Sequence, residues 1–142
     1  MANPFTEAAF FSQRNNVNSQ ANRRRADVDL QRRQFEAFEA PRAVEDFGFN
    51  VGQGRARVPN GMGRRGLLSS GIYRRALADF QRQAQLGAED LQRGLSSRRS
   101  AFEMAIQDIE DQRRAAIDQL NLERTGSSMQ AAALIRSILG GN

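Results

Sequence analysis

The sequence predicts an all-α protein built mainly from two long helices, and three observations support this fold class. Apolar residues recur at steps of four, three and four from Phe80 to Leu120, with few interruptions. Such an eleven-residue repeat keeps one face of a nearly straight helix apolar along its whole length. The stretch from Thr6 to Ala40 contains neither glycine nor proline. No alternation of strand and helix patterns accompanies either stretch, so a mixed α/β fold is not indicated.

The apolar face is too narrow to form a globular core by itself. Of the 142 residues, 39% are hydrophobic when glycine is left out, and the mean hydropathy is −0.63. A compact domain has about 45–50% apolar residues by a count that includes glycine. We therefore expect an elongated, partner-dependent protein. Its helices are expected either to form an extended hairpin or coiled coil, or to splay apart and contact different neighbours.

The N-terminal arm, residues 1–40, is predicted to be one helix from Thr6 to Ala40, preceded by Pro4. Its apolar positions fall at helical steps and are Phe10, Val17, Ala21, Val28, Phe35 and Phe38. Pro41 is expected to end this helix, because the residue before a proline is pushed out of the helical region.

Residues 41–68 are predicted to form a basic, glycine-rich loop. Residues 51–75 hold six arginines and no acidic residue, whereas the two flanking segments are nearly neutral. Phe47 and Phe49 fit either a short extended segment or a loop that two phenylalanines anchor on another surface, and we favour the anchor. The arginines of this loop are candidates for contacts with phosphates or with an acidic protein surface: Arg55, Arg57, Arg64 and Arg65.

Residues 69–123 are predicted to form a long coiled-coil helix that begins with Ser69 as its N-cap, with Leu68 and Tyr73 in the staple positions. The apolar face from Phe80 to Leu120 is called the apolar stripe below. Arg98 and Arg113 fall on this stripe, where a polar residue either sets the register or pairs with an acid across the interface. The candidate helix interface consists of Phe80, Leu91, Leu95, Phe102, Ile106, Ile109, Ile117 and Leu120.

Residues 124–142 are predicted to form a short C-terminal helix and tail. Thr125 to Ser128 are expected to break the long helix, and Met129 to Leu139 then follow as a short amphipathic helix. Two roles remain open for this helix: it folds back onto the long helix, or it docks into a neighbour.

Charged side chains along the long helix sit at helical spacing and indicate a solvated face. Arg99 and Glu103 are one such pair, four residues apart. The arginine doublets are balanced by nearby acids, and we interpret them in the same way. The acidic residues Asp108, Glu110 and Asp111 lie beside two arginines, so a metal site is not indicated there.

The composition argues against catalysis. Cysteine and histidine are both absent, which removes disulfides, thiolate nucleophiles, imidazole bases and soft metal sites. The run from Gly61 to Gly66 matches G-x-G-x-x-G, but a dinucleotide site needs a buried strand before it, and the preceding residues are polar and rich in glycine. We expect a non-enzymatic protein with no cofactor.

The segment from Arg64 to Phe80, RRGLLSSGIYRRALADF, opens the long helix. With the helix that follows, over about residues 64–123, it resembles small helical virion proteins encoded among the head–tail connector and tail genes of tailed bacteriophages. The resemblance implies a structural role in many symmetric copies, with other virion proteins as partners and the virion, made in the host cytoplasm, as the location.

The leading hypothesis is therefore a virion structural component that assembles through the apolar stripe, as a homo-oligomer or with other virion proteins. One alternative is a nucleic-acid-associated packaging or ejection protein that uses the basic loop. Another is a bacterial coiled-coil adaptor. The N-terminus lacks the pattern of a signal peptide, and no segment approaches the roughly 20 apolar residues of a membrane span, so no membrane partner is expected.

Overall fold

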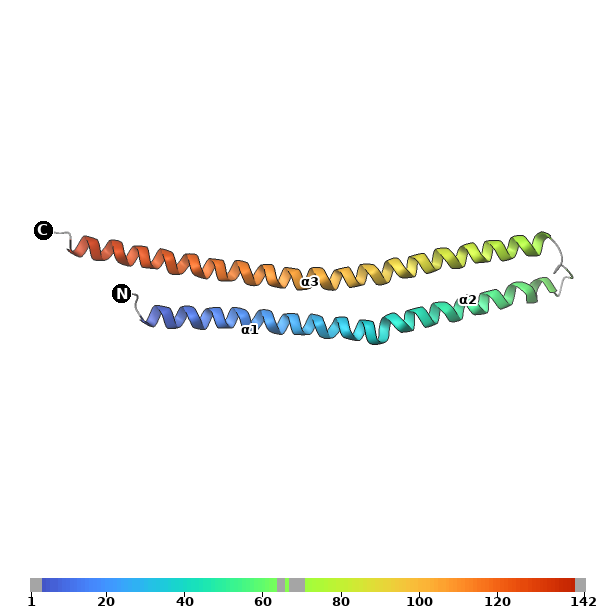
Figure 1. Ribbon diagram of the computed structural model, residues 1–142, viewed down its shortest axis with the longest axis horizontal. Coiled ribbons are helices and arrows are strands. Elements are labelled where there is room, and N and C mark those ends of the chain that lie inside the picture. The colour runs from blue at the N-terminus through green and yellow to red at the C-terminus, as the bar shows by residue number, and fades with distance from the viewer. Residues whose placement is uncertain (1–3, 64–65, 67–70, 140–142) are drawn as a thin grey trace. The chain divides into compact units, whose positions relative to one another are not determined.

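The computed structural model describes residues 4–63, 66 and 71–139 of the chain. This part of the chain forms α1 (Pro4–Gln34), a π-helical turn η1 (Phe35–Glu39), α2 (Ala40–Gly63) and α3 (Gly71–Leu139). The three α-helices are labelled in Figure 1. No strand occurs among these residues. The predicted all-α class with long helices is confirmed.

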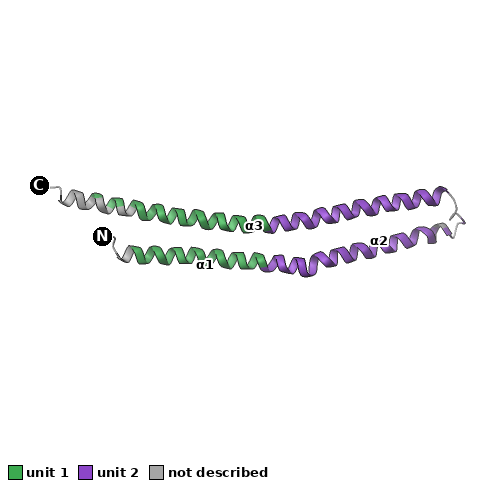
Figure 2. Ribbon diagram, in the orientation of Figure 1, with its two compact units in different colours: residues 1–29, 103–142 green, residues 30–102 purple. Residues whose placement is uncertain are grey.

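The helices divide into two compact units (Figure 2). Unit 1 comprises residues 1–29 and 103–142, and unit 2 comprises residues 30–102. Within each unit two helical segments lie side by side and run in opposite directions. In unit 2 these segments are α2 and the first half of α3, which together make an antiparallel hairpin.

The core is small in both units. Among the residues whose burial is described, the buried ones are Phe10 in unit 1, and Phe35 and Ala40 in unit 2. The other residues on the inner faces are half-buried. Each unit is therefore held together by a single seam between two helices.

The prediction that Pro41 ends the first helix is wrong, because the helical backbone continues through η1 into α2. The N–H of Ala40 donates to the carbonyl oxygen of Phe35, five residues earlier. A proline ring in a regular α-helix clashes with the carbonyl four residues before it. The wider π turn directly ahead of Pro41 relieves this clash, and the chain stays helical.

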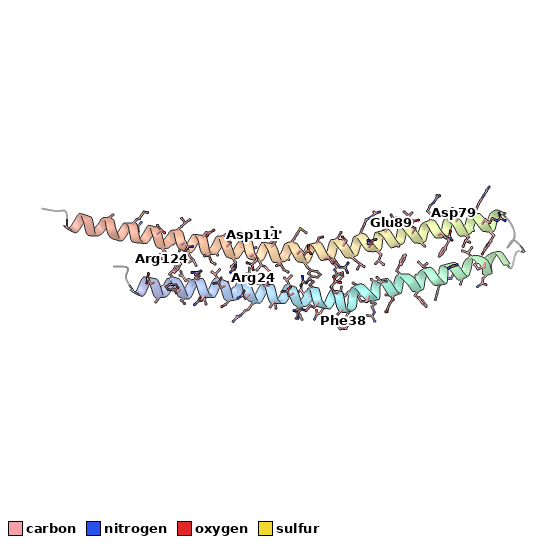
Figure 3. All side chains as sticks on the ribbon, in the orientation of Figure 1. Arg24, Phe38, Asp79, Glu89, Asp111 and Arg124 are labelled. Atoms are coloured by element: carbon pink, nitrogen blue, oxygen red, sulfur yellow. The ribbon has the colours of Figure 1, made fainter. Side chains whose placement is uncertain are left out.

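The π turn also changes which residues face α3. Phe35 and Ala40 are both buried although they are five residues apart, whereas Phe38 is 72% exposed. The expectation that Phe38 belongs to the apolar face is thus incorrect. A π turn holds one residue more than the α-helical count, and this extra residue displaces Phe38 to the outer side, where Figure 3 shows it.

Residues 41–63, predicted to be part of a loop, are helical as well. Their glycines hide a helical pattern, in which Val51, Gly54 and Val58 recur at steps of three and four and are half-buried. Packing of this face against α3 outweighs the poor intrinsic propensity of glycine and of Pro59, which lies inside the helix.

The reversal between α2 and α3 includes Gly66, whose φ is +68°. Its N–H donates to the carbonyl oxygen of Gly63 over 3.1 Å. A left-handed backbone after a helix end favours glycine, which has no Cβ to clash. The predicted N-cap Ser69, the staple residue Leu68, and Arg64 and Arg65 lie outside the described residues.

At its other end α3 does not break where the sequence predicted. The helix runs through Thr125 and Gly126 to Leu139, so residues 124–139 are not a separate short helix. The Thr125 hydroxyl donates to the carbonyl oxygen of Asn121 over 2.8 Å. Such bonding to the preceding turn satisfies a threonine side chain inside a helix, so Thr125 does not break the helix. The alternative in which this segment folds back onto α3 is excluded.

Candidate functional site

The apolar stripe of α3 lies on the face that packs within each unit. In unit 2 the half-buried residues of the stripe include Phe80, Leu91, Leu95 and Phe102. In unit 1 they include Ile106, Ile109, Ile117 and Leu120. The stripe is therefore used for packing inside this chain.

Two glycines let aromatic rings approach the helix backbone in unit 2. A Cβ added at Gly54 would lie 2.6 Å from the Phe80 ring, and one added at Gly87 would lie 2.9 Å from the Phe47 ring. Real Cβ atoms essentially never come closer than 3.0 Å to another heavy atom. Phe47 thus packs α2 onto α3, whereas its predicted companion Phe49 is 67% exposed.

An aromatic and ionic cluster surrounds the π turn. Phe35 is 2% exposed and its ring centroid lies 5.8 Å from that of Phe102. The guanidinium carbon of Arg98 lies 5.3 Å from the Phe35 centroid, and Arg98 Nη1 donates to Glu39 over 2.8 Å. Arg98, a polar residue on the stripe, therefore pairs with an acid across the interface, which was one of its two predicted roles.

Arg99 binds Glu36 through two parallel hydrogen bonds of 2.7 and 2.9 Å. The hydrogen bond and the charge of Arg99 hold the pKa of Glu36 below its usual value of 4.5, and Glu36 in turn raises the pKa of Arg99. Both side chains are largely exposed, and exposed pairs stabilise a fold only slightly. We interpret this bidentate contact as a determinant of register more than of stability.

The corresponding anchor of unit 1 is Phe10. Its ring meets that of Phe11 edge to face, with centroids 5.7 Å apart. The guanidinium carbon of Arg124 lies 4.9 Å from the Phe10 centroid, and Arg124 Nη2 donates to Glu7 over 2.8 Å. One arginine on α3 thus fixes two neighbouring residues of α1.

A second ionic cluster in unit 1 centres on Glu110, which accepts hydrogen bonds from Arg25 and Arg113, each over 3.1 Å. Arg113 Nη1 also donates to the side-chain oxygen of Asn18 over 3.3 Å. Arg113, the second arginine on the stripe, therefore contacts α1 through an amide, and its acidic partner lies on its own helix.

An open groove of about 350 Å³ also lies between the helices of unit 1. Its lining combines polar and apolar side chains and consists of Gln13, Asn16, Val17, Gln20, Ala116, Gln119, Leu120 and Glu123. The polar groups that this groove offers are the side-chain amides and the carboxylate of Glu123, beside the aliphatic Val17 and Leu120.

Sequence reasoning missed the contacts between charged residues of different helices. Arg99 was paired with Glu103 on its own helix, and the arginine doublets, which include Arg24 and Arg25, were placed on a solvated face. In the structure Arg24 donates to Gln112, and Arg25 and Arg99 bind acids of the opposite helix. The missing signal was the antiparallel register, because only a known register shows which charges face each other.

The basic segment, residues 51–75, includes the C-terminal half of α2 and the start of α3. Arg55 and Arg57 are exposed on α2, and Arg74 and Arg75 are exposed on α3. Arg57 Nη2 contacts the side-chain oxygen of Gln53 over 3.4 Å. The other two predicted contact residues of this segment, Arg64 and Arg65, are not among the described residues.

Large hydrophobic side chains remain exposed on both units. They comprise Phe11, Leu30, Phe38, Val44, Phe49, Ile72, Leu86, Met104, Leu122 and Met129. In the described part of the chain, no group of three or more potential ligands could hold a metal ion. Over the same residues, no helix combines the length and apolar character needed to cross a membrane.

Compared with known proteins, the chain matches no protein-family model, no curated protein and no solved structure. Function is therefore inferred from the chain's own residues.

Proposed function

We propose that the protein is a non-enzymatic structural component that assembles through its outer surface, as at the head–tail connector or tail of a bacteriophage virion. The observation that carries this proposal is that, among the residues whose burial is described, ten large hydrophobic side chains are exposed and three residues are buried. Isolated exposed hydrophobic residues are ordinary on proteins. Their excess over the buried ones here indicates surfaces that partners cover.

Because the α3 stripe packs against α1 and α2 within the chain, we place assembly on the outer faces, which carry the exposed hydrophobic side chains. The hypothesis of assembly through the stripe is therefore replaced by assembly through the outer faces.

A non-enzymatic role agrees with the chemistry of the side chains. The sequence has no histidine or cysteine, and many of its ion pairs join one helix to the other. The virion setting has separate support, namely the resemblance of the segment from Arg64 to Phe80 to small virion proteins. A bacterial coiled-coil adaptor would share the architecture and would differ in the complex that contains it.

Native fractionation of the source cells tests whether the protein belongs to a virion or to another complex. A virion component should sediment in large particles whose nucleic acid resists nuclease, together with other structural proteins. An adaptor should co-fractionate with a complex that contains no protected nucleic acid. Recovery of the chain only as a free monomer would contradict both assembly proposals.

Light scattering on the purified full-length chain tests whether the outer faces mediate assembly. We expect an oligomer that Phe38→Ser together with Leu122→Ser dissociates without loss of helicity, because both side chains are 72% exposed. Leu95→Asp is the matched contrast and should lower the helicity itself, because Leu95 lies in the seam of unit 2. An oligomer that survives the outer-face substitutions would show that assembly uses other residues.

A further inference from the structure

The basic segment is brought to one end of unit 2 by the antiparallel packing. Gly54 of α2 lies against Phe80 of α3, so the residues that follow Gly54 run beside the first turns of α3. Arg55 and Arg57 therefore share this end of the unit with Arg74 and Arg75. Four arginines that are up to 20 residues apart in the sequence become one local concentration of positive charge.

This charge has no paired carboxylate in the described part of the chain. No carboxylate occurs between Asp46 and Asp79, and these four arginines make no ion pair with any described residue. Elsewhere Arg25, Arg98 and Arg99 bind acids across the helix seam. The arginines at the end of unit 2 are therefore available to an external polyanion.

The directions of these arginines indicate the kind of polyanion. Successive residues of an α-helix are about 100° apart around its axis. Arg55 and Arg57 thus leave α2 about 200° apart, and Arg74 and Arg75 leave α3 about 100° apart. Charges on several sides of a helix pair do not form the single face that lies on a lipid surface. Arginines arranged in this way suit a flexible polyanion that can bend around the end of the unit.

Double-stranded DNA fits this end poorly. Its major groove is about 12 Å wide and admits one helix, whereas two packed helices are about 20 Å across. A single strand is flexible enough to reach several sides of the pair. Its bases are also unpaired and can stack on an aromatic side chain.

The aromatic residues near the basic segment differ in how accessible their rings are to a nucleic-acid base. Phe47 packs against Gly87 and Tyr73 is half-buried, whereas Phe49 is 67% exposed. Phe49 lies six residues before Arg55, about 9 Å along the axis of α2. Glu45 and Asp46 come just before Phe49 and mark the boundary of the basic segment.

We propose that this end of unit 2 binds single-stranded nucleic acid, with its phosphates at Arg55, Arg57, Arg74 and Arg75 and a base stacked on Phe49. Arginine suits this role because its planar group binds phosphate oxygens in pairs. The binding has no sequence preference, because none of these contacts reads base edges. This activity goes beyond the proposed assembly role and does not depend on it.

Fluorescence anisotropy with a labelled oligothymidine of about 20 nucleotides tests the charge contacts, with salt varied from about 50 to 200 mM. A variant with all four arginines replaced by glutamine should bind much more weakly. The slope of log affinity against log salt should also fall by about 3, since each phosphate contact contributes about 0.7 for single strands.

A matched control removes the same amount of charge elsewhere. It replaces four exposed arginines outside the basic segment with glutamine, namely Arg14, Arg23, Arg33 and Arg114. This control should retain most of the affinity and most of the salt slope. Equal losses in the two quadruple variants would mean that only net charge matters, and they would overturn the proposal.

Single substitutions test the stacking contact. Phe49→Ala should weaken binding of the oligothymidine about tenfold, within the range measured for one stacked base. Met104→Ala is the matched control, because Met104 is similarly exposed but lies outside the basic segment, and it should leave the affinity unchanged. Both residues point to solvent, so circular dichroism should show full helicity for each variant.

The nature of the polyanion is tested with the same protein. Tighter binding to a duplex of equal length, or to vesicles of anionic lipid, would overturn the proposed single-strand preference. The absence of binding to the oligothymidine at about 50 mM salt would overturn the proposal as a whole.

Discussion

The glycines of unit 2 differ in what surrounds them, and this difference predicts opposite effects of alanine at neighbouring positions. At Gly52 an added Cβ would meet nothing within 4 Å, whereas at Gly54 it would lie 2.6 Å from the Phe80 ring. Both residues are inside α2, so the intrinsic helix propensity changes equally at both. Any difference between Gly52→Ala and Gly54→Ala therefore reports the packing of the Phe80 ring.

The magnitudes follow from two opposing terms. Replacing an interior helical glycine with alanine stabilises a helix by about 1 kcal/mol, whereas forcing a methyl group into a packed interface costs about 1–3 kcal/mol. Gly52→Ala should thus stabilise the chain by about 1 kcal/mol. Gly54→Ala should leave the stability unchanged or lower it by up to about 2 kcal/mol. The two variants should differ by about 1–3 kcal/mol.

Thermal unfolding followed by circular dichroism measures this difference. For a chain of this length, 1 kcal/mol corresponds to roughly 3–4 °C in melting temperature, so Gly52→Ala should melt at least several degrees above Gly54→Ala. Shortening the ring with Phe80→Leu should make room for the methyl group and turn Gly54→Ala into a neutral or stabilising change. Equal melting temperatures for the two alanine variants would refute the close approach of Phe80 to Gly54.

Three further predictions concern the π turn and its ion pairs. Deleting Phe38 in a Pro41→Ala background, where no proline ring clashes with the shortened turn, removes the extra residue of η1 and should leave the melting temperature within a few degrees of that background, whereas deleting Ser19 rotates part of α1 by about 100° and should lower it strongly; equal effects would contradict the assigned register. Because Arg99 lowers the pKa of Glu36 from 4.5, their pair stabilises the fold above about pH 4.5 and the stabilisation is lost as the pH falls through the lowered pKa. Glu36→Gln should therefore lose less melting temperature than the parent between about pH 5 and pH 3, and identical acid profiles would argue against the pair. Arg98→Ala removes an exposed ion pair and a cation–π contact and should cost about 1 kcal/mol in urea unfolding; a loss above about 3 kcal/mol would show that Arg98 also supports the packing.

The sequence predicted the helical class and the inner face of α3, because a repeat sustained over 40 residues leaves few alternatives. It failed between Pro41 and Gly63, where local propensity and tertiary packing disagree. Proline and glycine there signal a loop, but Phe47 and Gly54 make contacts with α3 that only a helix can provide. The π turn could not be read from one sequence, because it resembles a simple interruption of the helical repeat. The ionic contacts required the register, which periodicity alone does not give.

These contacts also explain how a seam with so little burial selects one register. A uniform apolar repeat can slide along its partner, and every shift by one repeat restores similar packing. Features that occur once remove this freedom. In unit 2 they are the fit of Phe80 on Gly54 and of Phe47 on Gly87, together with the bidentate pair of Arg99 and Glu36.

The residues that set the register therefore all lie on the seam, which leaves the outer faces free to take part in other interactions. Phe38 and Phe49 are on these faces, and neither is needed to hold α2 on α3 because both point to solvent. Substitutions at these two positions can then alter binding without unfolding the chain. Assembly through Phe38 and stacking on Phe49 can be separated for the same reason: Phe38→Ser should change the oligomer and leave nucleic-acid binding intact, and Phe49→Ala should do the reverse. A loss of both properties in either variant would show that the two surfaces are one.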